Sequence, residues 1–138
     1  MVAKKLNAVF KGGCEEDCPP PEAIDCSVEV FRIVRTKPPT VLDFKSFMDS
    51  KPNVWSKKPE PLKCRSCGLS VYANSEDAKL ARDGSPYLQG RKIASKMLQI
   101  MDGKILKTEN LNPGGTSHHT WWFKSANPHS GFNVVEEE

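Results

Sequence analysis

The sequence contains no long apolar run and no export signal. Its 138 residues include no uninterrupted apolar stretch of about 18, the length that a membrane-spanning helix needs. The opening residues, MVAKKLNAVFKGGC, lack the apolar core and the small-residue cleavage site of a secretion signal. We therefore expect a cytoplasmic protein without a membrane partner.

Motifs of the common enzyme classes are also missing. The chain has no nucleophile elbow, P-loop, dinucleotide fingerprint, paired-histidine helix motif or kinase signature. Function has to be argued from particular sites and not from a fold. Without these motifs, no set of residues in the sequence points to a known reaction. We favour a non-enzymatic binding module over an enzyme.

A strong excess of one charge is absent as well. Lys and Arg number 20 against 17 Asp and Glu, which gives a formal net charge of +3. Nucleic-acid-binding domains usually carry a steeper, clustered basic excess. The nearest approach to a basic cluster comprises Lys51, Lys57, Lys58, Lys63 and Arg65. Nucleic-acid binding is therefore compatible with the sequence but not indicated, and we expect another protein as the partner.

The composition that is present predicts one small domain. With 38% hydrophobic and 27% charged residues, the chain is long enough to bury a modest core. We expect an α+β fold with a mainly antiparallel sheet and two short helices. The domain should span residues 28–138. An irregular segment, residues 1–27, should precede it, because Gly12-Gly13 and a run of three prolines disfavour regular structure.

Alternating apolar residues predict the strands. Residues 27–36, SVEVFRIVRT, carry apolar side chains on both faces, as an inner strand does. The Asp102-Gly103 pair favours a hairpin with a type I′ turn within residues 93–108. Further strands are expected at residues 69–72, 118–124 and 132–135, the last two as antiparallel partners.

Capping residues predict the two helices. One should run over residues 40–50, where Thr40 and Asp43 have capping-box spacing. The other should run over residues 75–83, with Ser75 as its N-cap.

Five cysteines raise the prospect of a metal site. The run Cys64-Arg65-Ser66-Cys67 resembles one half of a zinc ribbon, in which two thiolates share a tight turn at tetrahedral spacing around Zn²⁺. A second pair is available in the N-terminal segment. We therefore expect a structural zinc that fastens this segment to the body. Its ligands would be Cys14, Cys18, Cys64 and Cys67, with Cys26 as a substitute.

Other states of the cysteines remain open. In a reducing cytoplasm a disulfide framework is not expected, so buried thiols without metal are the simplest alternative. Redox chemistry is a weaker one, since no βαβ pattern surrounds Cys64 and Cys67. Histidines, with His118 or His119 among them, could complete the site with Cys64 and Cys67 in place of the N-terminal cysteine pair.

The most unusual composition lies in residues 112–122, NPGGTSHHTWW. Its loop offers backbone amides and hydroxyls that can contact a partner or cradle an anion. The candidate binding residues of the loop are Gly114, Gly115, Thr116 and Ser117.

In the strand that follows, neighbouring residues face opposite sides, so His118 and His119 should diverge. Trp121 should face the core. Trp122, if it faces solvent, would be a binding contact, because large aromatic side chains are enriched at interfaces.

These observations lead to two hypotheses. The first is a small binding module, stabilised by zinc, that uses residues 112–122 as its partner surface; Trp55, in a lysine-rich connector, extends that surface. The second is a small enzyme that acts on a nucleotide, a nucleic acid or another phosphate-containing substrate, with His118 or His119 as acid/base.

Overall fold

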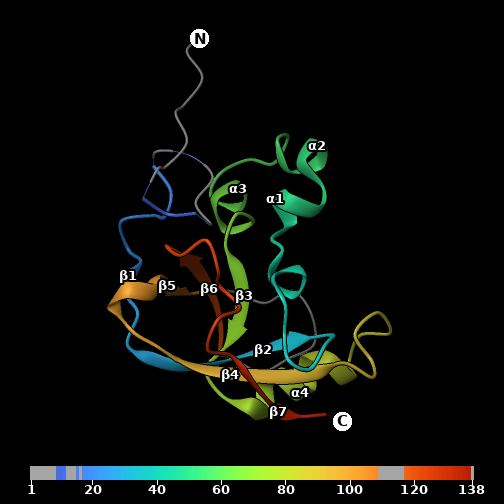
Figure 1. The fold of residues 1–138 in the computed structure, drawn as a ribbon. Coiled ribbons are helices and arrows are strands. Elements are labelled where there is room, and N and C mark those ends of the chain that lie inside the picture. Colours follow the sequence, from blue (N-terminus) through green and yellow to red (C-terminus); the bar gives the residue numbers. More distant parts are fainter. Residues whose placement is uncertain (1–8, 12–14, 16, 109–116, 138) are drawn as a thin grey trace.

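The computed structural model describes residues 9–11, 15, 17–108 and 117–137. In this part, seven strands form one antiparallel sheet in the order β1-β5-β6-β3-β2-β4-β7. The strands are Ile24–Asp25 (β1), Val28–Val34 (β2), Leu69–Tyr72 (β3), Lys92–Leu98 (β4), Gly103–Lys107 (β5), His118–Phe123 (β6) and Asn133–Glu136 (β7). The expected α+β class with an antiparallel sheet is confirmed (Figure 1).

Short helices join these strands. The α-helices are Phe47–Ser50 (α1), Pro52–Trp55 (α2), Leu62–Arg65 (α3) and Ser75–Asp83 (α4). Two 3-10 turns, Val41–Phe44 (η1) and Ile100–Asp102 (η2), complete the described elements. Helix α4 has the expected bounds, although Asn74 caps it in place of Ser75, by accepting a hydrogen bond from the Asp77 amide.

The expected helix over residues 40–50 is wrong, because two short turns replace it. Thr40 does form the predicted capping box with Asp43, and a second capping box follows at Ser46. The Asp43 carboxylate also accepts hydrogen bonds from the Arg35 amide and the Thr36 hydroxyl. These bonds tie η1 to the end of β2. Lys45 then has an extended backbone, so η1 and α1 are two separate helical turns.

The sheet curls strongly, since one short stretch of chain forms both β1, at one end of the strand order, and β2, which is separated from it by three strands in that order. Strand β1 pairs with β5, whereas β2, two residues further on, pairs with β3 and β4. The connection from β4 to β5 is also short, although three strands separate them in the sheet. In Figure 1 β2 and β4 accordingly run across the molecule while β3 and β6 rise from them.

The curl explains why the expected hairpin over residues 93–108 is wrong. Its two strands exist, but β4 pairs with β2 and β7, and β5 pairs with β1 and β6. Asp102 ends the 3-10 turn, where its carboxylate accepts from the Gln99 amide. Gly103 has φ 125°, and a Cβ there would collide with the carbonyl oxygen of Trp122. The Asp-Gly pair therefore turns a corner of the sheet.

Strand β7 also differs from expectation, because it pairs with β4 and not with β6. Residues 124–132 connect β6 to β7. Phe132 of this connection packs in the main core, with its ring centroid 4.8 Å from that of Phe44 and 5.9 Å from that of Trp121. The last strand consequently reaches the free edge of β4.

The two faces of the sheet have different covers. The main core lies on one face and includes Val30, Leu69, Ala94, Trp121 and Phe132. The other face is covered in two parts. Helix α4 packs on Tyr72 and Ile93, and a cysteine-rich cluster lies on Trp122.

No helix in the described residues is long and apolar enough to cross a membrane, as the sequence predicted.

Candidate functional site

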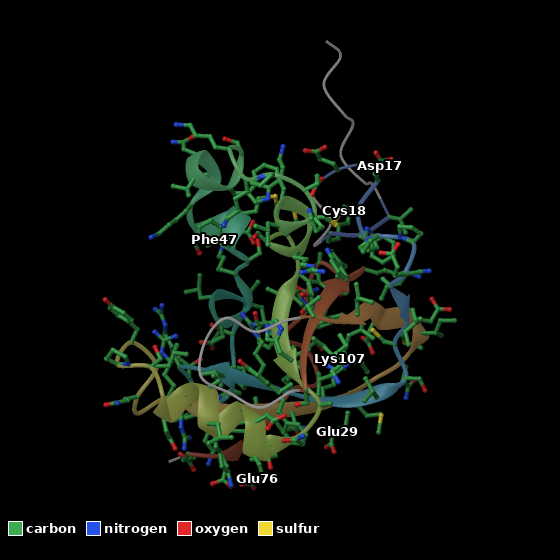
Figure 2. The ribbon with its side chains drawn as sticks, turned by 180° about the vertical axis from the view of Figure 1, so that it is seen from behind. Asp17, Cys18, Glu29, Phe47, Glu76 and Lys107 are labelled. Carbon is green, nitrogen blue, oxygen red and sulfur yellow. A yellow bond between two sulfur atoms is a disulfide. The ribbon has the colours of Figure 1, made fainter. Side chains whose placement is uncertain are left out.

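Three of the five cysteines lie together at α3: Cys64 belongs to this helix, and Cys18 and Cys67 pack in the same buried cluster. Cys18, Cys64 and Cys67 are buried, with 2%, 7% and 0% of their surface exposed, and pack with Phe10 and Trp122. Cys18 and Cys64 form a disulfide with their Cα atoms 5.7 Å apart, and Cys67 is disulfide-bonded as well. The N-terminal segment is thus covalently attached to α3, beside which Cys18 lies in Figure 2.

The expectation of reduced thiols is wrong for these residues. A sulfur in a disulfide has no thiolate charge and is not a zinc ligand of the expected kind. Within the described ranges, no three His, Cys, Asp or Glu side chains are grouped so that they could hold a metal ion. Cys14, the fourth expected ligand, lies outside these ranges. Structural zinc stays a prediction, and this prediction applies to the protein with its cysteines reduced.

Cys26 is a free cysteine, but the structure does not bring it to the other three. It is buried in the main core on the opposite face of the sheet. Burial, with Asp102 and Asp25 nearby, raises the pKa of the Cys26 thiol to about 12. A thiol with such a pKa is neither a good nucleophile nor a ready ligand, so its expected role as a substitute ligand has no support.

Trp122 is a structural residue and does not face solvent, which was the condition for its predicted role as a binding contact. None of its surface is exposed. Its indole Nε1 donates a hydrogen bond of 3.0 Å to the carbonyl oxygen of Cys64. A Cβ on the nearby Gly68 would collide with the Thr120 side chain and would lie 3.3 Å from the same Nε1, so glycine permits this segment to approach β6 closely. Trp122 therefore fastens the disulfide-bonded cluster to β6.

His118 lies at the centre of a small polar network on the same face of the sheet. Its Nδ1 is 2.9 Å from the Thr108 hydroxyl, and its Nε2 is 3.0 Å from the Ser70 hydroxyl. The ring also packs edge-on against Tyr72. Burial lowers the pKa of His118 below its usual value, so the imidazole is neutral at pH 7. With both nitrogens engaged, it is not available as a zinc ligand.

Ser70 was not among the residues that the sequence singled out. It reaches His118 because β3 and β6 pair with Tyr72 opposite His118 and Ser70 opposite Thr120. Ser70 and His118 are then diagonal neighbours on one face. A serine in a four-residue strand carries no sign of this contact until the strand register is known.

His119 points to the opposite face from His118, as expected for adjacent strand residues. Its Nδ1 lies 2.7 Å from the backbone carbonyl of Ser117. The amide of Ser117 in turn donates to the Asp77 carboxylate at 3.0 Å. Ser117 thereby ties the start of β6 to α4. Its expected loop partners Gly114, Gly115 and Thr116 lie outside the described residues.

Residues 45–65, the helical cap, form a projection made of α1, α2 and α3 that stands above the sheet (Figure 1). The sequence predicted an exposed, lysine-rich connector over residues 51–63 of this range. The prolines of this range argued against helices in the sequence. In the structure they are compatible with helices, because Pro52 lies at the first turn of α2 and Pro61 precedes α3. Comparison of the chain with protein-family models, curated proteins and solved structures finds no match.

Proposed function

We propose that this protein is a small binding module and that its helical cap docks a protein segment rich in acidic and apolar side chains. The main support for this proposal is that the helical cap carries both a net positive charge and exposed apolar side chains. Residues 112–122 were the surface expected from the sequence. Their strand part is largely buried, and their loop part stays a prediction.

The cap carries more positive charge than the whole chain. It contains six basic side chains and two acidic ones, a net charge of +4, whereas the complete sequence has +3. Both acidic residues serve the backbone locally: Asp49 caps α1, and Glu60 accepts from the Cys64 amide at 2.9 Å. In Figure 2, Phe47 of the cap lies far from Glu29 and Glu76. Such a charge distribution favours an acidic partner.

Exposed lysines on the cap are available to that partner. Lys45, Lys51 and Lys57 are exposed, and no carboxylate in the described part of the chain lies within ion-pair distance of them. The Lys58 ammonium lies 4.8 Å from the centre of the Phe47 ring, which joins charge and apolar surface at one point.

The cap also exposes apolar side chains. Phe47, Val54 and Leu62 are 37%, 54% and 44% exposed. Bases stack on aromatic rings, whereas aliphatic side chains such as Val54 and Leu62 provide no such platform. Aliphatic and aromatic groups together suit apolar anchors of a protein. This composition supports a protein partner over a nucleic acid.

Charge reversal in the cap should weaken binding of an acidic amphipathic peptide. The probe is a fluorescent 16-residue peptide of alternating Glu and Leu pairs, measured by anisotropy at low ionic strength. The double variant Lys51→Glu/Lys57→Glu should raise its Kd about tenfold, because two attractive contacts become repulsive and surface charges are poorly screened at low salt.

Lys107→Glu is a matched control, since Lys107 is an exposed lysine on β5, outside the cap. It should change the Kd less than twofold. Equal losses in both variants, or no saturable binding by the wild type, would contradict the docking site. Tighter binding of a 16-nucleotide oligothymidine with a steep salt dependence would favour a nucleic acid instead.

The cysteine cluster is expected to stabilise the cap by a disulfide or, in the reduced chain, by zinc. Because Cys18, Cys64 and Cys67 are disulfide-bonded, denatured unreduced protein should react with Ellman's reagent at no more than two of its five cysteines. A protein kept reduced in the predicted cytoplasmic location would instead show five thiols. The spacing of the two cysteine pairs then supports one bound zinc per chain. Thiol counting and metal analysis on one preparation separate the two states.

The enzyme hypothesis with a phosphate-containing substrate stays a prediction. Thr116 lies outside the described residues, and the Ser117 hydroxyl accepts from the Ala73 amide at 3.2 Å.

A further inference from the structure

We propose that Ser70 is a nucleophilic serine activated by His118 and that this pair accepts the acyl group of activated carboxylic esters. The proposal is independent of the helical cap, since neither residue belongs to it. It rests on an exposed serine, a buried imidazole in contact with its hydroxyl, and a third polar group that holds the ring.

The position of Ser70 combines access and contact. Ser70 is exposed, whereas its neighbours Leu69 and Val71 are buried. Its Oγ lies 3.0 Å from Nε2 of His118. This distance is within the range of a nucleophile hydrogen-bonded to its general base. A substrate can therefore approach the hydroxyl from solvent while the base remains 9% exposed.

The other side of the imidazole is anchored. Nδ1 of His118 lies 2.9 Å from the Thr108 hydroxyl and 3.3 Å from the Thr108 carbonyl oxygen. The Thr108 hydroxyl is also 2.9 Å from that of Thr120. We assign the Nδ1–H donor to Thr108, since a carbonyl oxygen can only accept. Nε2 then accepts from the Ser70 hydroxyl, which is the orientation that a general base requires.

The expected step is acylation. The Ser70 Oγ attacks the ester carbonyl carbon and forms the new C–O bond, while its proton passes to Nε2 of His118. The ester C–O bond breaks, and the same proton goes to the departing alkoxide, which leaves as an alcohol. The Ser70 ester is the product, and water can hydrolyse it by the same path. Thr108 is a positioning residue in this scheme.

The test uses a fluorophosphonate probe and p-nitrophenyl acetate with the full-length chain. Mass spectrometry should find the phosphonyl group on Ser70, and p-nitrophenol should be released in a burst. Ser70→Ala should abolish both signals. His118→Gln should slow labelling by about a hundredfold, the usual size of general-base assistance. Thr108→Val should slow it less.

Ser27→Ala is the matched control, because Ser27 is exposed and no histidine in the described part of the chain contacts it. It should label and turn over like the wild type. Circular dichroism establishes that each variant is folded. Absence of labelling at Ser70 would overturn the proposal. Labelling at an unchanged rate in folded His118→Gln would do the same, since the hydrogen bond would then be merely structural.

Discussion

Removing the Cys18–Cys64 disulfide should lower the free energy of unfolding by about 4 kcal/mol, because the bond closes a loop of 46 residues. In the chain-entropy description the crosslink restricts the unfolded chain, and longer loops give larger effects. The double variant Cys18→Ser/Cys64→Ser should therefore melt about 12 °C below the wild type. Urea unfolding followed by circular dichroism measures the difference.

Cys26→Ser provides the control for this experiment. Cys26 is as deeply buried as Cys18 but is in no disulfide, so its substitution changes a thiol to a hydroxyl without removing a crosslink. Its loss should be about 1 kcal/mol. Similar losses in both variants would show that the disulfide contributes little. A melting temperature of the wild type that falls on adding a chelator would identify zinc as the stabilising link.

Trp122→Ala should be similarly destabilising, by about 4 kcal/mol, because it leaves a large cavity between the sheet and the cysteine cluster. It also removes the hydrogen bond to the Cys64 carbonyl. Trp122→Phe retains most of the ring volume and should lose about 2 kcal/mol, mainly through the missing donor. Urea denaturation of the three proteins gives these differences directly.

Trp55 is the comparison residue for Trp122. It is half-buried, and its Nε1 also donates to a carbonyl, that of Lys63, at 2.9 Å. Trp55→Ala should therefore destabilise the protein clearly less than Trp122→Ala, because less apolar surface is lost from the interior. Should Trp122→Ala unfold at the same urea concentration as the wild type, Trp122 could not be the residue that holds the cluster.

The elements that the sequence predicted well are those specified by local patterns. The alternation in residues 28–34 indicated the inner strand β2, and the capping signal near residue 75 indicated α4, although the cap is Asn74. The capping box at Thr40 was also correct, although the helix it opens is only one turn long. Propensity and capping act within a few residues, so they can be read before the fold is known.

The partners of the strands could not be read in this way. Asp102-Gly103 has the composition of a hairpin turn. In the structure, however, Asp102 ends a 3-10 turn, and the following strand β5 pairs with β6 and not with β4. The observed pairing buries Val30, Ala94 and Trp121 in a common core, and these residues come from segments far apart in the sequence. Such long-range burial outweighs the turn preference of two residues.

The amino-acid sequence by itself determined the local patterns and the reactive residue types of this protein: an α+β pattern, paired cysteines, two adjacent histidines and a lysine-rich stretch between prolines. Only the tertiary structure decided their roles. It buried Trp122, joined Cys18 to Cys64, and brought the hydroxyl of Ser70 to His118 across two strands. The reason is physical, because the curl of the sheet sets which side chains share a face, and that curl arises from strand pairings along the whole chain.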